Sequence, residues 1–160
     1  MKPLLLLFLV FAPVGSCIAK CMPTIWSSEL ALGGIHYGDT EQSVRGKLGN
    51  PVSAEPRNLK LPRIIYPGLS IALAEDSSVS ELTSSSDRYC TPHRICPGMP
   101  FERAKEAYCS IKILKSSGDT TTAYFGSELS TRLTFTIEHD VIQTIRAGYN
   151  PLEQYYPQRN

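Results

Sequence analysis

The sequence predicts an α+β fold made of two tandem repeats, each a short helical segment packed on an antiparallel sheet. Three observations predict it. A glycine turn followed by a helical pattern occurs twice at an offset of 60 residues, and apolar residues alternate along the chain after each helix. The length of 160 residues fits one ordinary domain or two very small ones.

The internal repeat rests on the order of its elements more than on any single matched residue. Each unit begins with an apolar lead-in, turns at a glycine, continues into a helix and ends in alternating strands. The matched pairs are 35–48 with 95–108 at offset 60, 69–73 with 133–137 at offset 64, and 79–82 with 142–145 at offset 63.

In the first unit, Asp39 or Thr40 is expected to cap a helix that stops near Gly49-Asn50-Pro51. The strand that follows alternates apolar Leu69, Ile71 and Leu73 with smaller residues. Residues 76–78 are expected to form a hairpin turn into the last strand of this unit.

In the second unit, Pro100 suits the first helical position, and Phe101, Ala104 and Tyr108 form the apolar stripe of the helix. Leu133, Phe135 and Ile137 then alternate with threonines, and a turn at His139-Asp140 leads into the last strand. The expected organisation is a leader at 1–19, repeats at 20–88 and 89–150, and an irregular tail at 151–160.

The first nineteen residues predict a secretory signal peptide. Lys2 precedes an unbroken apolar run at 4–10, and small residues follow before Lys20. The run is shorter than the roughly 20 apolar residues that span a bilayer. Cleavage after Ala19 gives an exported protein; alternatively, the stretch 14–17 resembles a bacterial lipobox with Cys17 as the acylated residue.

Cleavage after Ala19 leaves an even number of cysteines, four, which in an oxidising compartment predicts up to two disulfides. Three pairings are open, and Cys96 or Cys90 with Cys109 is the first choice, because it would tie the second helix to its own lead-in. The Cys90 and His93 spacing does not match a structural zinc site, so no metal is expected. The four cysteines are Cys21, Cys90, Cys96 and Cys109.

Charge and motifs exclude several classes of function. The 16 basic and 15 acidic residues are nearly balanced, unlike those of a sequence-independent nucleic-acid binder. No Gly-x-Ser-x-Gly elbow, phosphate-binding loop or dinucleotide fingerprint is present, so neither an enzyme nor a cofactor is expected. A small secreted hydrolase that uses His93 or His139 is the least favoured alternative.

The segment Tyr37-Gly-Asp-Thr-Glu-Gln-Ser-Val44 followed by Leu48-Gly-Asn-Pro51 resembles the helix signature of the BamE/SmpA-OmlA-type envelope proteins. Two such units in tandem also resemble the architecture of β-lactamase inhibitor protein. In the second unit Pro100 stands where that pattern has Thr, and the Leu-Gly-x-Pro ending is absent. The resemblance implies a helix-plus-sheet fold and non-catalytic protein binding outside the cytoplasm.

These observations together predict a periplasmic or secreted inhibitor or immunity protein that occludes a secreted hydrolase or toxin. The alternative is an outer-membrane lipoprotein for envelope assembly or maintenance, which would contact the membrane only through an acylated Cys17. The resemblance to the inhibitor architecture implies that a partner docks on the sheet face away from the helices, and alternation places polar and aromatic residues on that face. The surface candidates are Tyr124, Thr134, Thr136 and Arg146.

Overall fold

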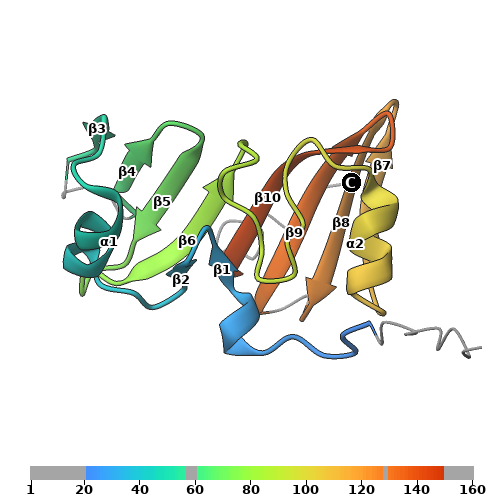
Figure 1. The fold of residues 1–160 in the computed structure, drawn as a ribbon, viewed down its shortest axis with the longest axis horizontal. Helices are drawn as coiled ribbons and strands as arrows, with labels where there is room; N and C mark the ends of the chain where they lie inside the picture. Colours follow the sequence, from blue (N-terminus) through green and yellow to red (C-terminus); the bar gives the residue numbers. More distant parts are fainter. Residues whose placement is uncertain (1–20, 57–60, 128–129, 150–160) are drawn as a thin grey trace, which may run out of the picture.

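A computed structural model describes residues 21–56, 61–127 and 130–149. The predicted signal peptide at 1–19, with the lipidation candidate Cys17, and the predicted tail at 151–160 lie outside the described residues. The described chain is mixed α+β, with two α-helices and a mostly antiparallel sheet (Figure 1). Neither described helix has the length and apolar character needed to cross a membrane.

One eight-stranded sheet forms the framework, with the order β3-β4-β5-β6-β10-β9-β8-β7. Every neighbouring pair is antiparallel, including the central pair of β6 and β10, which no hairpin connects. The last strand of each half, β6 and β10, lies at the centre, and β3 and β7 form the two edges. The strands are β3 (Ser53–Ala54), β4 (Arg63–Tyr66), β5 (Leu69–Leu73), β6 (Val79–Ser84), β7 (Lys112–Ser117), β8 (Thr120–Gly126), β9 (Thr131–Glu138) and β10 (Val141–Tyr149).

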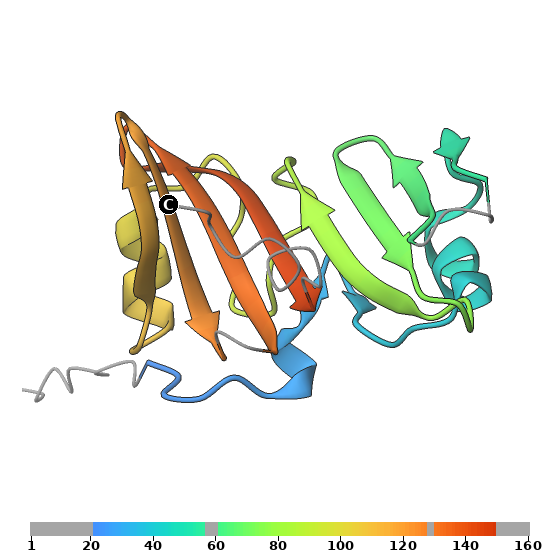
Figure 2. The same cartoon turned by 180° about the vertical axis from the view of Figure 1, so that it is seen from behind.

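Both helices cover the same face of this sheet (Figures 1 and 2). α1 (Glu41–Leu48) and α2 (Phe101–Ala107) lie over its two halves. The small hairpin of β1 (Ala31–Leu32) and β2 (Ile35–His36) lies between them on that side, after a 3₁₀ turn at Ser27–Glu29. These elements bury the apolar face of the sheet, whereas no helix of the described residues lies on its other face.

The first turn of each helix is stabilised differently. The Thr40 hydroxyl accepts a hydrogen bond from the Ser43 backbone N–H at 3.2 Å, so Thr40 is the side-chain cap of α1. Pro100 occupies the N-cap of α2 rather than its first helical position, which begins at Phe101. The prediction for Pro100 was wrong by one residue, because its ψ of 137° is extended rather than helical.

A continuous core fills the space between the helices and the sheet. Val44 of α1 and Ala104 of α2 are both 0% exposed and belong to the same buried cluster as the alternating strand residues. The predicted alternation of Leu69, Ile71 and Leu73 is therefore correct, since all three belong to this core, whereas Ala72 between them pairs with polar residues of β4 and β6.

The same backbone hydrogen bonds attach each helix to its half of the sheet. In the first half, Gly38 N–H donates to the Val79 carbonyl at 2.8 Å, and Val79 N–H donates back to the Asp39 carbonyl at 2.7 Å. Glu41 N–H, at the start of α1, donates to the Ser77 carbonyl at 3.0 Å. The lead-in to α1 is thus held against the turn that begins β6.

The second half repeats this arrangement residue for residue. Gly98 N–H donates to the Ile142 carbonyl at 2.7 Å, and Ile142 N–H donates to the Met99 carbonyl at 2.9 Å. Phe101 N–H donates to the Asp140 carbonyl at 2.8 Å. Gly98, with φ of 89°, matches the 85° of Gly38, a left-handed conformation that favours glycine.

Within the sheet the two halves join through one strand pair, β6 with β10, whose register pairs Thr83 with Arg146 and Glu81 with Gly148. Gly148 has a φ of 130°, and a Cβ built on it would lie 2.5 Å from the Ser80 carbonyl oxygen. The joint therefore requires a residue without a side chain at position 148.

We expect Gly148→Ala to lower the free energy of unfolding by about 2–4 kcal/mol, from backbone strain together with the collision with Ser80. Urea unfolding followed by circular dichroism measures the change. Gly46→Ala is the matched control, because Gly46 lies inside α1 with open space around its Cβ position. That control should gain about 0.5–1 kcal/mol, and equal effects at the two positions would contradict the role given to Gly148.

Candidate functional site

The face of the sheet opposite the helices, here called the open face because no described helix covers it, carries polar side chains in cross-strand register. Along one row, Tyr124 pairs with Thr134, Thr134 with Arg146, and Arg146 with Thr83. The alternate residues of the same strands belong to the buried core on the helix side. The structure thus places the predicted partner-binding residues Tyr124, Thr134 and Arg146 side by side, with Thr136 two residues along β9.

The four candidates differ in their access to solvent. Tyr124 and Thr134 are only 3% and 4% exposed, so the expectation that they are surface residues was wrong. The Arg132 guanidinium lies over the Tyr124 ring at 5.3 Å from its centroid, and Arg132 is itself only 4% exposed. Thr136 is half-buried, and the Arg146 side chain is 30% exposed. The accessible candidates are therefore Thr136 and Arg146.

A carboxylate between two arginines lies at the joint of the two halves. Arg63 Nη2 contacts Glu81 Oε1 at 2.7 Å, and Arg146 Nη1 lies 4.0 Å from Glu81 Oε2. Arg63 Nη1 also donates to the Ser70 hydroxyl at 3.2 Å. Glu81 comes from β6, Arg63 from β4 and Arg146 from β10, so this network connects both halves on the open face.

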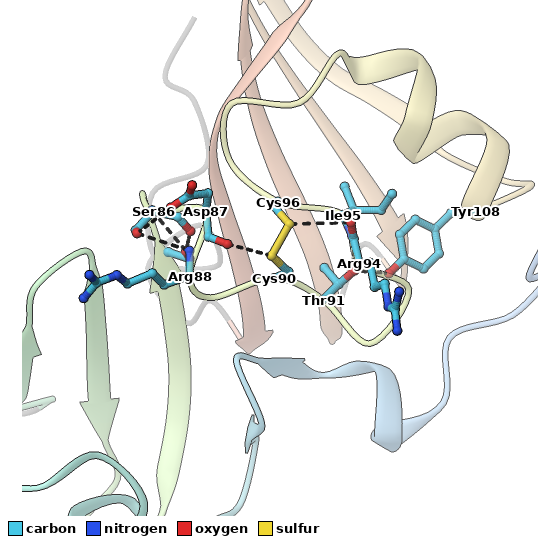
Figure 3. The surroundings of a disulfide bond; sticks show 10 residues. Ser86, Asp87, Arg88, Cys90, Thr91, Arg94, Ile95, Cys96 and Tyr108 are labelled. Atoms are coloured by element: carbon cyan, nitrogen blue, oxygen red, sulfur yellow. Dashed lines mark hydrogen bonds between the residues drawn. A yellow bond between two sulfur atoms is a disulfide. The ribbon is translucent and has the colours of Figure 1, made fainter.

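Two disulfides stabilise the second half of the chain and the segment that precedes the first. Cys90 pairs with Cys96, and Cys21 pairs with Cys109. Figure 3 shows the first bond closing the loop that carries Thr91 and Arg94. All four predicted cysteines are thus bonded, as in proteins of oxidising compartments.

The predicted pairing of Cys109 with Cys96 or Cys90 was wrong. Met22 N–H donates to the Ala107 carbonyl at 2.9 Å, and Cys109 N–H donates to the Met22 carbonyl at 3.0 Å. These bonds lay the segment after Cys21 along the end of α2, which brings Cys21 beside Cys109. Cys90 and Cys96 meet because Thr91 N–H donates to the Ile95 carbonyl and closes a tight turn.

A buried carboxylate, that of Glu29, lies beside the more exposed His93 of the Cys90–Cys96 loop. Glu29 is 6% exposed, and its Oε2 has no hydrogen-bond partner among the described residues. His93 Nε2 lies 3.4 Å from that oxygen, and its ring meets Tyr108 edge-on at 5.4 Å between centroids. The Tyr108 hydroxyl donates to the Thr91 hydroxyl at 2.9 Å. Burial raises the pKa of Tyr108 well above its usual range, so this phenol remains a donor.

Sequence reasoning did not single out Glu29. The only local signal for it is an acidic residue immediately before the apolar stretch at 30–32. His139 is exposed and lies 3.7 Å from the equally exposed Asp119, an arrangement typical of a solvated surface pair. In the described ranges, no group of three or more His, Cys, Asp or Glu side chains could hold a metal ion.

These features define the molecule as an α+β protein with two disulfides and an antiparallel sheet whose two described α-helices pack on the same face. No protein-family model matches the sequence, and no curated protein matches it significantly. Two solved structures share the fold. One is an extracellular protein containing an SCP domain from Bacillus anthracis str. Ames, at 14% identity and a TM-score of 0.51 over 84% of this chain.

The second is a DUF4309 family protein (YjgB) from Bacillus subtilis subsp. subtilis str. 168. It is 13% identical, with a TM-score of 0.51, over 73% of this chain and 83% of that protein. The match to the first structure spans 51% of its length, so this chain corresponds to about half of that protein. At these identities the likeness is one of fold, and neither structure is a BamE protein or a β-lactamase inhibitor protein.

We expect the two disulfides to contribute unequally to stability. Cys21 and Cys109 are 88 residues apart, whereas Cys90 and Cys96 are 6 apart. In the chain-entropy model, removing the first by paired Cys→Ser changes should cost about 4–5 kcal/mol, and removing the second about 2 kcal/mol. Urea unfolding of the two double variants measures both costs, and a larger loss from opening the short loop would contradict this account.

The contact between His93 and Glu29 gives a further prediction. His93→Ala should lower the free energy of unfolding by about 1–3 kcal/mol, because the buried Glu29 carboxylate loses its nearest partner. Glu29→Gln in the same background should recover part of that loss. A double-mutant cycle by urea denaturation measures the coupling, which separates it from the lost contact with Tyr108. Additive effects within about 0.3 kcal/mol would exclude a direct interaction.

Proposed function

We propose that this chain is an exported, non-enzymatic protein-binding module, an inhibitor or immunity protein that occludes an extracytoplasmic hydrolase or toxin. The observation that carries the proposal is a continuous eight-stranded sheet with both described helices on one face, so that its other face is covered by no described helix and carries the partly exposed Arg63, Thr136 and Arg146. Two disulfides favour a periplasmic or secreted location. They also favour a rigid surface, which loses little conformational entropy on binding.

We also propose that residues 20–88 and 89–150 are tandem repeats of the BamE/SmpA-OmlA type, arranged as in β-lactamase inhibitor protein. Two observations support this relation. Each half runs helix and then four strands, and the hydrogen bonds of Gly38 to Val79 recur between Gly98 and Ile142. In this arrangement the duplicated halves supply one surface larger than either could form alone.

The exposed part of the open face is the proposed docking surface. Arg146 and Arg63 are each about one-third exposed and surround Glu81 at the joint, and Thr136 lies two residues from Thr134 on β9. Arginines with part of their guanidinium accessible are common anchors in protein interfaces. A partner seated here would contact both halves at once.

The test uses the purified mature chain as bait for extracytoplasmic proteins of its own source, with matched variants. Thr136→Arg and Arg146→Glu alter the proposed surface, whereas Arg103→Glu makes the same charge change on exposed α2. We expect the wild type and Arg103→Glu to retain one protein in a stoichiometric complex and to block its activity. Both open-face variants should lose at least about 90% of that binding, roughly 1.4 kcal/mol.

Circular dichroism of each variant checks that its fold is retained. Retention of the same protein by both open-face variants, or recovery of no stoichiometric complex with the wild type, would overturn the proposal.

A lipoprotein is the alternative, favoured by the sequence Val14-Gly15-Ser16-Cys17. The intact mass of the mature protein decides between them, since a chain that begins at a diacylglyceryl Cys17 has a different mass from one that begins at Lys20. An acylated Cys17 would replace the inhibitor proposal with a role in envelope assembly or maintenance.

A further inference from the structure

The two edges of the eight-stranded sheet are unequal. β3 at one edge has two residues, whereas β7 at the other has six, Lys112–Ser117. Within the described part of the chain, β7 pairs with β8 only. An edge strand leaves alternate N–H and C=O groups directed outward, ready to pair with another strand. β7 is therefore the longer of the two templates for strand addition.

The side chains of β7 are exposed, apart from the half-buried Leu114. Ile113 is 57% exposed and is one of four large hydrophobic residues exposed in the described chain. It pairs with Ala123, whose side chain belongs to the core, so Ile113 faces the helix side of the sheet. An aliphatic side chain left accessible on an edge strand favours contact with an apolar residue of a neighbouring strand.

An irregularity in β7 brings two lysines to the same face. In a regular strand, residues 112 and 115 would point to opposite faces. The register shift between Ile113 and Lys115 instead pairs Lys112 with Tyr124 and Lys115 with Thr122, which are two residues apart on β8. Both lysine side chains therefore leave the strand on the open face, opposite β8 positions that lie about 7 Å apart along the strand. Neither lysine forms an ion pair with a described residue.

We propose that β7 binds an extended acidic segment of a partner protein by adding it as a ninth strand. Carboxylates two residues apart on that segment face Lys112 and Lys115, and the aliphatic residue between them contacts Ile113. The segment thus has the pattern acidic, aliphatic, acidic. This inference rests on the proposed binding function and names the chemistry of the partner.

A second copy of this chain is the competing occupant of the same edge. Pairing of β7 with another β7 would bring the lysines of both strands onto one short ladder, where like charges are destabilising. The same charges attract carboxylates. Charge complementarity therefore favours an acidic strand over self-association.

The probe is a fluorescein-labelled peptide of alternating Glu and Val, compared with one of alternating Lys and Val, and titrated with the purified mature chain at low ionic strength. Fluorescence anisotropy should show binding of the Glu peptide at least about tenfold tighter than that of the Lys peptide. Hydrogen exchange should show new protection confined to the amides of β7. Equal binding of the two peptides, or protection elsewhere, would overturn the proposal.

A charge reversal at the edge is the sharper test. Lys112→Glu with Lys115→Glu should weaken binding of the Glu peptide at least about tenfold and strengthen that of the Lys peptide. Arg103→Glu with Lys105→Glu makes the same net charge change on the solvent-facing side of α2 and should leave both affinities unchanged. Ile113→Thr should weaken both peptides. An equal loss of affinity for the Glu peptide in the α2 control would show that the effect comes from long-range charge, and it would overturn the strand-addition site.

Three results separate this inference from the proposed function. In the first, the Thr136 and Arg146 variants lose the captured partner but the Lys112 and Lys115 variant retains it. This result overturns the inference and supports the proposed function. In the second, the Glu peptide binds specifically to β7 but no stoichiometric partner is recovered. This result overturns the proposed inhibitor function and supports β7 as a site for an acidic strand. Protection of β7 that rises with protein concentration in the absence of peptide identifies a second copy and overturns the inference.

Discussion

The pairing of β6 with β10 is the constraint on which the architecture depends. Without it the chain would form two four-stranded sheets, each with one helix and with additional exposed edges. The joint is held on one side by apolar residues, where Leu82 pairs with Ala147, and on the other by Glu81 between two arginines. Gly148 permits the close approach of the two backbones. One continuous core and one continuous open face follow from this strand pair.

Each helix is positioned by backbone bonds rather than by its own stability. α1 and α2 have 8 and 7 residues, lengths that are marginal for an isolated helix in water. Their lead-ins are bonded to the turns that start β6 and β10, so the central strands hold the helices as well as the joint. The two disulfides add covalent links near the end of α2 and in the loop that precedes it. They fix the loops that carry His93 and Glu29 around Tyr108, at the end of α2.

Local patterns were enough to predict the elements, whereas long-range pairing was not predictable. The alternation at 69–73, a cap at Asp39 or Thr40 and the turn at His139 are encoded by neighbouring residues and were predicted from them, and the structure selects Thr40 as the cap. The Cys21 to Cys109 bond depends on hydrogen bonds across more than half of the chain, and no local pattern reports these. The site was harder to predict than the fold, because alternation gives the face of Tyr124 correctly but says nothing of the Arg132 side chain that covers it.

The placement of the two lysines on the edge strand β7 could not be predicted from local sequence patterns either. In the sequence, Lys112 and Lys115 are spaced as though on opposite faces of a strand, and only the bulge places them together. Bulges and lysines on edge strands oppose indiscriminate pairing and so protect the chain against edge-to-edge aggregation. That protection is selective rather than absolute, because a charge that repels a second copy lowers the energy of an acidic strand in the same place. The edge that is protected against self-pairing is therefore also the edge with a defined preference for a partner.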